Sequence, residues 1–203
     1  YLNYGDKSNE IIVKVDNSKQ PNSRWYSGSG IFRNVWIETA DKLRVAQWGT
    51  YITTPKVTAQ KTSIQIETTI QNQYTASKKA TVITTIFKED TIVTSTTQNI
   101  TIGANANQTI KQDVQVGTPI LWSIEKPELY TAVTEILVDD QIVDQYKTNF
   151  GIRSFKFDVN KGFILNGKQV KIKGVCLHHD LGPLGSAINT RAIERQLEIL
   201  KGM

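Results

Sequence analysis

Two histidines and an aspartate stand side by side near the end of the chain, as His178-His179-Asp180, and these are the only histidines in the sequence. Imidazole and carboxylate groups in such a run could bind a metal ion, activate a nucleophile or hydrogen-bond a polar ligand. The preceding segment 170–177 alternates lysines with β-branched residues and predicts a strand. Because α/β folds carry ligands and catalytic groups at the carboxyl ends of strands, we take His178, His179 and Asp180 as candidate site residues.

The three kinds of chemistry make different demands on this run. A metal site needs further ligands, but adjacent histidines on an extended backbone point to opposite faces and no HxH, HxxxH or CxxC spacing accompanies them, so we expect no metal. Cys176 lies on the same strand face as His178, yet Cβ atoms about 6–7 Å apart fit a thiolate–imidazolium pair poorly. Two interpretations remain open: His178 and Asp180 bind a polyhydroxylated ligand, or they form a structural pair.

A second candidate is Arg24-Trp25-Tyr26, in a loop rich in Gly, Ser and Pro between predicted strands at 10–16 and 31–37. Aromatic faces stack on sugars or bases, and an arginine supplies fixed hydrogen-bond donors. The alternative is that Trp25 and Tyr26 fill the edge of a β-sandwich. The residues alone leave both interpretations open.

The overall charge argues against a nucleic-acid partner. The chain has 203 residues and a formal net charge of +5. Most of the basic surplus lies in 151–203, where Lys168, Lys171 and Lys173 are spaced along predicted strands without interleaved aromatic residues. This pattern is typical of a solvated strand face. No apolar run approaches the ~18 residues of a membrane span, and the single cysteine rules out an internal disulfide.

The middle of the chain predicts a β-sandwich. Thr/Ile/Val-rich segments at 63–71, 80–87, 91–96, 108–116, 129–138 and 141–147 are separated by turn residues at 88–90, 103–105 and 139–140. Short strands at roughly 8–12-residue intervals, with no helical period, are typical of an immunoglobulin-like sandwich. We expect this part to act as a spacer.

The pattern changes again after Gly151. A strand is predicted at 154–159, followed by a hairpin at 162–169 that turns at Asn166-Gly167. After the loop at 181–186, Ile193, Leu197 and Leu200 recur with helical spacing behind a cap at Asn189 or Thr190. A strand, a loop and a helix make half of a βαβ unit, and its apolar stripe needs the rest of a longer polypeptide to cover it.

Several separated motifs together resemble glycoside hydrolase family 2, the β-galactosidase/β-glucuronidase group. They are the stretch 17–37, which contains RWYSGSGIFRNVW (24–36), then PILWSIEKPELY (119–130), FGIR (150–153), FILNGK (163–168) and KGVCLHHD (173–180). Their order is that of the family. The resemblance implies three parts: the end of a sugar-binding jelly roll at 1–48, the immunoglobulin-like sandwich at 49–150, and the first strand-helix unit of a (β/α)₈ barrel at 151–203.

The resemblance also implies a function. The family hydrolyses terminal β-glycosides with retention of configuration, using two glutamates. Those glutamates lie on later barrel strands, so we expect no catalytic residue, metal or cofactor in this span and no activity of the segment alone. His178 matches a sugar-contacting histidine of the family, and Asp180 matches an acid of its glucuronidase-type members. The alternative is a non-catalytic carbohydrate-binding or adhesion module built on β-sandwiches.

Overall fold

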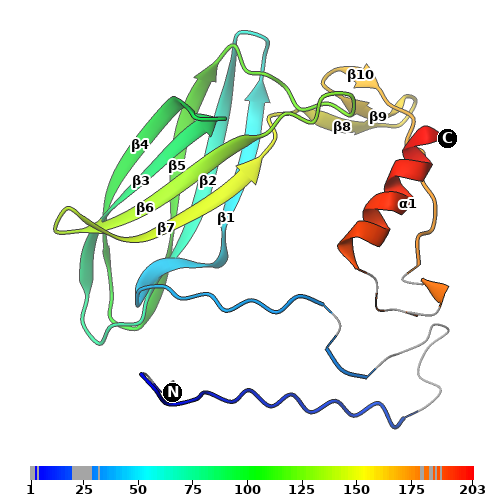
Figure 1. The fold of residues 1–203 in the computed structure, drawn as a ribbon. Helices are drawn as coiled ribbons and strands as arrows, with labels where there is room; N and C mark the ends of the chain where they lie inside the picture. Colours follow the sequence, from blue (N-terminus) through cyan, green and yellow to red (C-terminus); the bar gives the residue numbers. More distant parts are fainter. Residues whose placement is uncertain are drawn as a thin grey trace. The chain divides into compact units, whose positions relative to one another are not determined.

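The computed structural model describes residues 3, 5–19, 29–31, 33–178, 181, 182, 185, 187 and 189–203. The chain divides into two compact units, one of residues 38–173 and one formed by 1–37 together with 174–203. The larger unit is built of antiparallel strands (Figure 1). The smaller one contains the single helix of the described residues, α1 (Thr190–Gly202).

Two sheets make up most of the larger unit. One has the order β1-β2-β5 and the other the order β4-β3-β6-β7, and every strand pair in them is antiparallel. Their bounds are β1 (Leu43–Val57), β2 (Lys61–Asn72), β3 (Lys78–Lys88), β4 (Thr91–Ile102), β5 (Ala106–Gly117), β6 (Tyr130–Val138) and β7 (Gln141–Phe150). The predicted strands from 63 to 147 are thus confirmed, several of them with longer ends.

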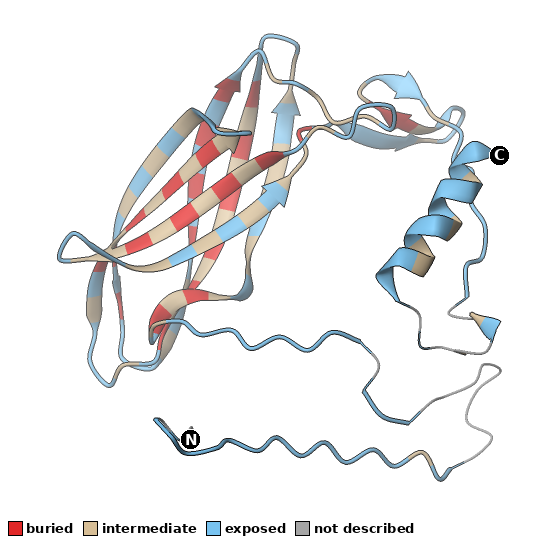
Figure 2. Cartoon of the chain, viewed as in Figure 1, coloured by how far each residue is buried: buried red, intermediate tan, exposed pale blue. Residues whose placement is uncertain are grey.

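The core lies between the two sheets because their strands alternate apolar and polar residues. Every second residue of β2 from Thr62 to Asn72 is buried, and Figure 2 shows the same banding along the central strands of both sheets. Ile64 and Ile66 pack in one cluster with Ile86 of the facing sheet, and all three are fully buried. Burying each such side chain contributes about 1.5–3 kcal/mol.

A small polar network lies inside this core. The Thr84 hydroxyl donates to the Gln112 side-chain oxygen at 2.8 Å and lies 3.1 Å from the Thr134 hydroxyl. The Gln112 amide in turn donates to the carbonyl of Val82. The hydroxyl of Thr68 is equally buried but has no hydrogen-bond partner among the described residues. The core therefore holds threonines whose hydroxyls are hydrogen-bonded, such as Thr84, and one, Thr68, whose hydroxyl is not.

Three predicted strands are wrong. The structure gives no strand at 10–16, at 170–177, or in the described residues of 31–37. These segments have the apolar alternation of strands but form no ladder with a neighbour, and a strand is stable only when its backbone groups are paired. Conversely, the sequence pattern did not predict β1. This strand crosses the domain boundary expected between residues 48 and 49. Two register shifts, at 45–50 and 53–56, disrupt its alternation.

The carboxyl-terminal elements follow the prediction more closely. A third sheet has the order β10-β9-β8, formed by β8 (Phe155–Asp158), β9 (Gly162–Leu165) and β10 (Lys168–Gln169). Asn166 and Gly167 have φ values of +48° and +79°, which confirms the predicted turn. Asn189 caps α1, its side chain accepting from the Ala192 amide at 2.9 Å. No helix in the described residues is long and apolar enough to cross a membrane.

Thr84 and Thr68 give a matched test of hydrogen bonding in the core. We expect Thr68→Val to raise the free energy of unfolding by about 1 kcal/mol, because valine has the same shape and removes a buried, unpaired hydroxyl. We expect Thr84→Val to lower it by about 1–3 kcal/mol, because Gln112 then loses its partner. Urea denaturation measures both, and equal effects of the two substitutions would contradict the assignment.

Candidate functional site

His178 is exposed, as are all the residues from 171 to 178, and this stretch forms neither strand nor helix. It is the only predicted site residue among those the structure describes. His179, Asp180, Arg24, Trp25 and Tyr26 lie outside the described residues, so the structure neither brings these side chains together nor separates them. Within the described residues no group of three or more His, Cys, Asp or Glu side chains could hold a metal ion.

The segment that leads to His178 starts from the β8–β10 sheet. The Val170 amide donates to the carbonyl of Phe163 at 2.9 Å and continues the hairpin by one residue. The Phe163 ring lies 5.3 Å from that of Phe157 and 6.3 Å from that of Phe155, measured between centroids. These contacts fix where the chain leaves the hairpin toward the candidate site.

The side chain of Asn166 connects the β9–β10 hairpin to the loop between β5 and β6. Its oxygen accepts from the Ser154 amide at 3.0 Å, and its amide group donates to the carbonyl of Trp122 at 2.9 Å. Its backbone N–H donates to the Ser154 carbonyl at 2.8 Å. One asparagine thus both permits the positive φ of the turn and joins three parts of the chain.

Trp122 forms the other side of this contact. We call its contacts with Asn166 and with residues 151–153 the joint. Its amide donates to the carbonyl of Ile152 at 2.8 Å, and the Arg153 guanidinium lies 5.1 Å from its ring centroid, within cation–π range. A Cβ at Gly151 would come within 2.9–3.0 Å of the Trp122 side chain, so the indole occupies the space that any other residue at 151 would need. Gly151 is therefore required here for close packing.

The two glutamates beside Trp122 are held ionised. A hydrogen bond from Lys88, and the charge of that lysine, keep the pKa of Glu128 below its ordinary value. A backbone hydrogen bond, a second one from Ser123 and the nearby charge of Lys168 lower the pKa of Glu125. The general acid of a glycosidase needs the opposite shift. Glu128 instead forms an ion pair with Lys88 of β3, and Glu125 accepts hydrogen bonds within the loop.

An open, mostly apolar cavity of about 570 Å³ adjoins the joint, lined in part by Trp122, Arg153, Phe163 and Ile172. Its charged lining groups are basic, Arg153, Lys171 and Lys173, and it has no carboxylate. The pair of acids that glycoside hydrolysis uses is therefore not present in this cavity.

The sequence did not reveal the roles of Trp122, Arg153 and Asn166. The Asn-Gly pair indicated the turn, but the partner of the asparagine amide lies 44 residues away, and no local pattern encodes that contact. The Asn166-Gly167 pair, which favours a turn with positive φ, was the one signal in the sequence that pointed to this region.

Comparison with known proteins places this geometry in context. The family model of glycosyl hydrolases family 2 matches residues 46–153. The β-galactosidase BoGH2A of Bacteroides ovatus is 45% identical over the whole of this chain, which covers 24% of that protein. A putative β-glucuronidase of Formosa agariphila is 32% identical, again over the whole chain, which covers 19% of it.

Solved structures are similar as well. A family 2 member from Bacteroides cellulosilyticus matches 88% of this chain and 23% of its own, with a TM-score of 0.83 and 37% identity. A Bacteroides uniformis β-glucuronidase matches 92% of this chain and 24% of its own, with a TM-score of 0.80 and 27% identity. The chain thus spans about a quarter or less of the length of these relatives.

The hydrogen bond from the Asn166 side chain to the Trp122 carbonyl can be tested by substitution. We expect Asn166→Asp to lower the free energy of unfolding by about 1–3 kcal/mol, because a carboxylate oxygen then faces the Trp122 carbonyl in place of an amide donor. Asn105→Asp is the control, since Asn105 has the same φ of +48° but an exposed side chain. Urea denaturation of both variants measures the difference, and equal losses would show that the amide contact contributes nothing.

Proposed function

The chain belongs to glycosyl hydrolases family 2, and from that membership we propose that it is an internal segment of a retaining exo-glycosidase that removes terminal β-linked sugars and resembles a β-galactosidase. The observation that carries the proposal is the 45% identity to a β-galactosidase across the whole chain. The relatives include both β-galactosidases and β-glucuronidases, and the higher identity favours the first.

We propose that the segment contains parts of three domains. Residues 1–48 end a sugar-binding jelly roll, 49–150 form an immunoglobulin-like sandwich, and 151–203 begin a (β/α)₈ barrel. The two antiparallel sheets around a common core support the middle assignment. Support for the last comes from the capped helix α1, none of whose residues is buried, as expected of a barrel helix without its neighbours.

In this proposal the chain binds and positions the sugar, and the rest of the polypeptide supplies the acid/base and nucleophile. His178, at the end of the segment from the hairpin, hydrogen-bonds a sugar hydroxyl, together with His179 and Asp180. Arg24, Trp25 and Tyr26 contribute donors and stacking faces from the jelly-roll side. No metal or cofactor in this span has a part in the proposed chemistry.

Comparing the segment with the full-length enzyme tests the general proposal. We expect the full-length enzyme to hydrolyse an aryl β-galactoside, with β-galactose as the first product seen by NMR. The 203-residue segment alone is expected to release no aglycone. A segment that turns over the substrate, or a first product of α configuration, would overturn the proposal.

The role of His178 has a sharper test in the full-length enzyme. We expect His178→Ala to lower kcat/KM by about 10²–10³-fold, because a sugar hydroxyl loses a hydrogen bond that is stronger in the transition state than in the ground state. The Tm should stay nearly unchanged, since the histidine lies exposed at a segment end. Steady-state kinetics and thermal unfolding on the same preparation measure both quantities.

Lys173→Ala, on the same exposed segment, is the matched control and should change neither quantity. If His178→Ala lowered the Tm and left kcat/KM unchanged, His178 would be a structural residue and would not contact the sugar.

A further inference from the structure

Asn166 and Gly167 form the turn of the β9–β10 hairpin, and the peptide bond between them is chemically reactive. Asn166 is the only asparagine in the chain that is followed by glycine. The backbone nitrogen of the residue after an asparagine can attack the side-chain carbonyl carbon, Cγ, and a glycine hinders this attack least because it has no Cβ. The sequence therefore holds one asparagine that is prone to deamidation.

The folded turn keeps the two reacting atoms apart. Both residues have a positive φ, +48° at Asn166 and +79° at Gly167, and Leu165 pairs with Lys168 across them, as in a type I′ turn. In such a turn the first central residue has a ψ of about +30°. At that angle the Gly167 nitrogen lies nearly opposite the Asn166 Cβ across the Cα–C bond. Attack on Cγ therefore requires the turn to open.

The side-chain amide of Asn166 is held as well. Its oxygen accepts from the Ser154 amide at 3.0 Å, and its nitrogen, which is the leaving group in deamidation, donates to the Trp122 carbonyl at 2.9 Å. The backbone N–H of Asn166 donates to the Ser154 carbonyl at 2.8 Å. The side-chain bonds oppose the rotation that would bring Cγ toward Gly167, and the backbone bond opposes opening of the turn.

The acceptor carbonyl is fixed by the rest of the joint. The Trp122 amide donates to the Ile152 carbonyl at 2.8 Å, and the Arg153 guanidinium lies 5.1 Å from the centroid of the indole. The indole also fills the space beside Gly151, where a Cβ would come within 2.9–3.0 Å of it. A substitution at 151 or 153 therefore loosens the contact with Asn166 without changing either reacting residue.

We propose that Asn166 is a conformationally gated modification site, which deamidates only when the joint and the hairpin open. In the open state the Gly167 nitrogen loses its proton and attacks Cγ of Asn166. A bond forms between this nitrogen and Cγ, the Cγ–Nδ2 bond breaks, and the side-chain nitrogen leaves with the proton as ammonia. Water then opens the cyclic imide at either carbonyl, which gives aspartate or isoaspartate.

Neither product can re-form the joint. Aspartate places a carboxylate oxygen opposite the Trp122 carbonyl, where a donor is required. Isoaspartate adds a methylene group to the main chain, which disrupts the pairing of Leu165 with Lys168. An opening that is otherwise reversible is thereby made permanent. This modification goes beyond the proposed hydrolase activity and uses none of the residues assigned to it.

Peptide mapping by mass spectrometry follows the reaction in the full-length enzyme at mildly alkaline pH. Replacement of the side-chain NH2 by OH raises the mass of the peptide that contains Asn166, and chromatography separates its aspartate and isoaspartate forms. We expect the folded wild type to deamidate at Asn166 at least about tenfold more slowly than the same enzyme unfolded in urea, because only the open fraction reacts.

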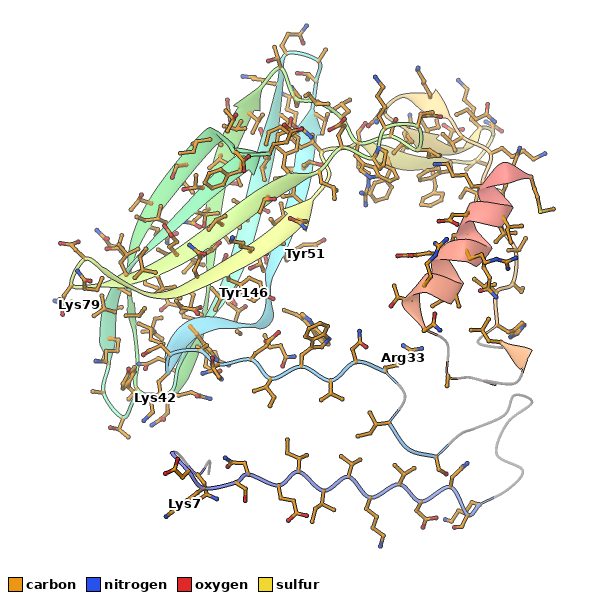
Figure 3. The ribbon with its side chains drawn as sticks, viewed as in Figure 1. Lys7, Arg33, Lys42, Tyr51, Lys79 and Tyr146 are labelled. Atoms are coloured by element: carbon orange, nitrogen blue, oxygen red, sulfur yellow. The ribbon has the colours of Figure 1, made fainter. Side chains whose placement is uncertain are left out.

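Gly151→Ala tests whether the joint is the gate. Its methyl group displaces the indole, so we expect deamidation at Asn166 to be at least about tenfold faster than in the wild type. Gly103→Ala is the matched control, because its Cβ makes only an ordinary contact and it lies at the end of the sandwich where Lys79 is labelled in Figure 3. Arg153→Ala, which removes only the guanidinium over the indole, should accelerate the reaction less and replaces Gly151→Ala if that variant does not fold.

Three results would overturn the proposal. The first is equal rates of deamidation in the folded and the urea-unfolded wild type, and the second is equal rates in Gly103→Ala and the joint variants. The third concerns the product: enzyme modified at Asn166, separated by ion exchange, should have a lower Tm than the unmodified enzyme, and an equal Tm would show that the joint re-forms. These readouts are masses and Tm values, so failure here is distinguishable from failure of the proposed function.

Discussion

The contact between Trp122 and the chain from Gly151 to Arg153 is the constraint on which the carboxyl-terminal part of the larger unit depends. The indole of Trp122 leaves room only for glycine at 151, and the Arg153 guanidinium lies over its ring. The backbone amide of Trp122 donates to the carbonyl of Ile152. The side-chain amide of Asn166 then donates to the carbonyl of Trp122 and joins this residue to the hairpin. These contacts therefore hold the β8–β10 sheet against the loop between β5 and β6 within the larger unit.

The loop before β6 secures the other side of this joint. Lys88 of β3 forms an ion pair with Glu128 and donates to the carbonyl of Leu129 at 3.1 Å, while the Tyr130 hydroxyl accepts from the Ile120 amide at 2.9 Å. Charge and hydrogen bonding thus fasten an irregular loop to a regular sheet. This explains why a stretch with little secondary structure carries one of the most specific motifs in the sequence.

Local patterns predicted those parts of the fold whose partners are close in sequence. The strands joined by turns at 88–90 and 139–140, the Asn166-Gly167 hairpin and the capped helix all follow from alternation, turn chemistry and capping over a few residues. The segments 10–16 and 170–177 carry the same alternation but lack a neighbouring strand. For the site, the pattern predicted His178 at the end of a strand that the structure does not give, and the Asn166–Trp122 contact spans 44 residues and could not be inferred locally.

The bulge in β1 shows where a break in the local rules carries information. Alternation fails between Val45 and Thr50, a tryptophan takes a positive φ, and the glycine after it has no room for a side chain. Each feature costs stability that a regular strand would retain, and the core has no need of any of them, since Ile52 and Ile70 pack normally on either side. A sequence that keeps such costs in an otherwise regular sheet is under a constraint other than folding.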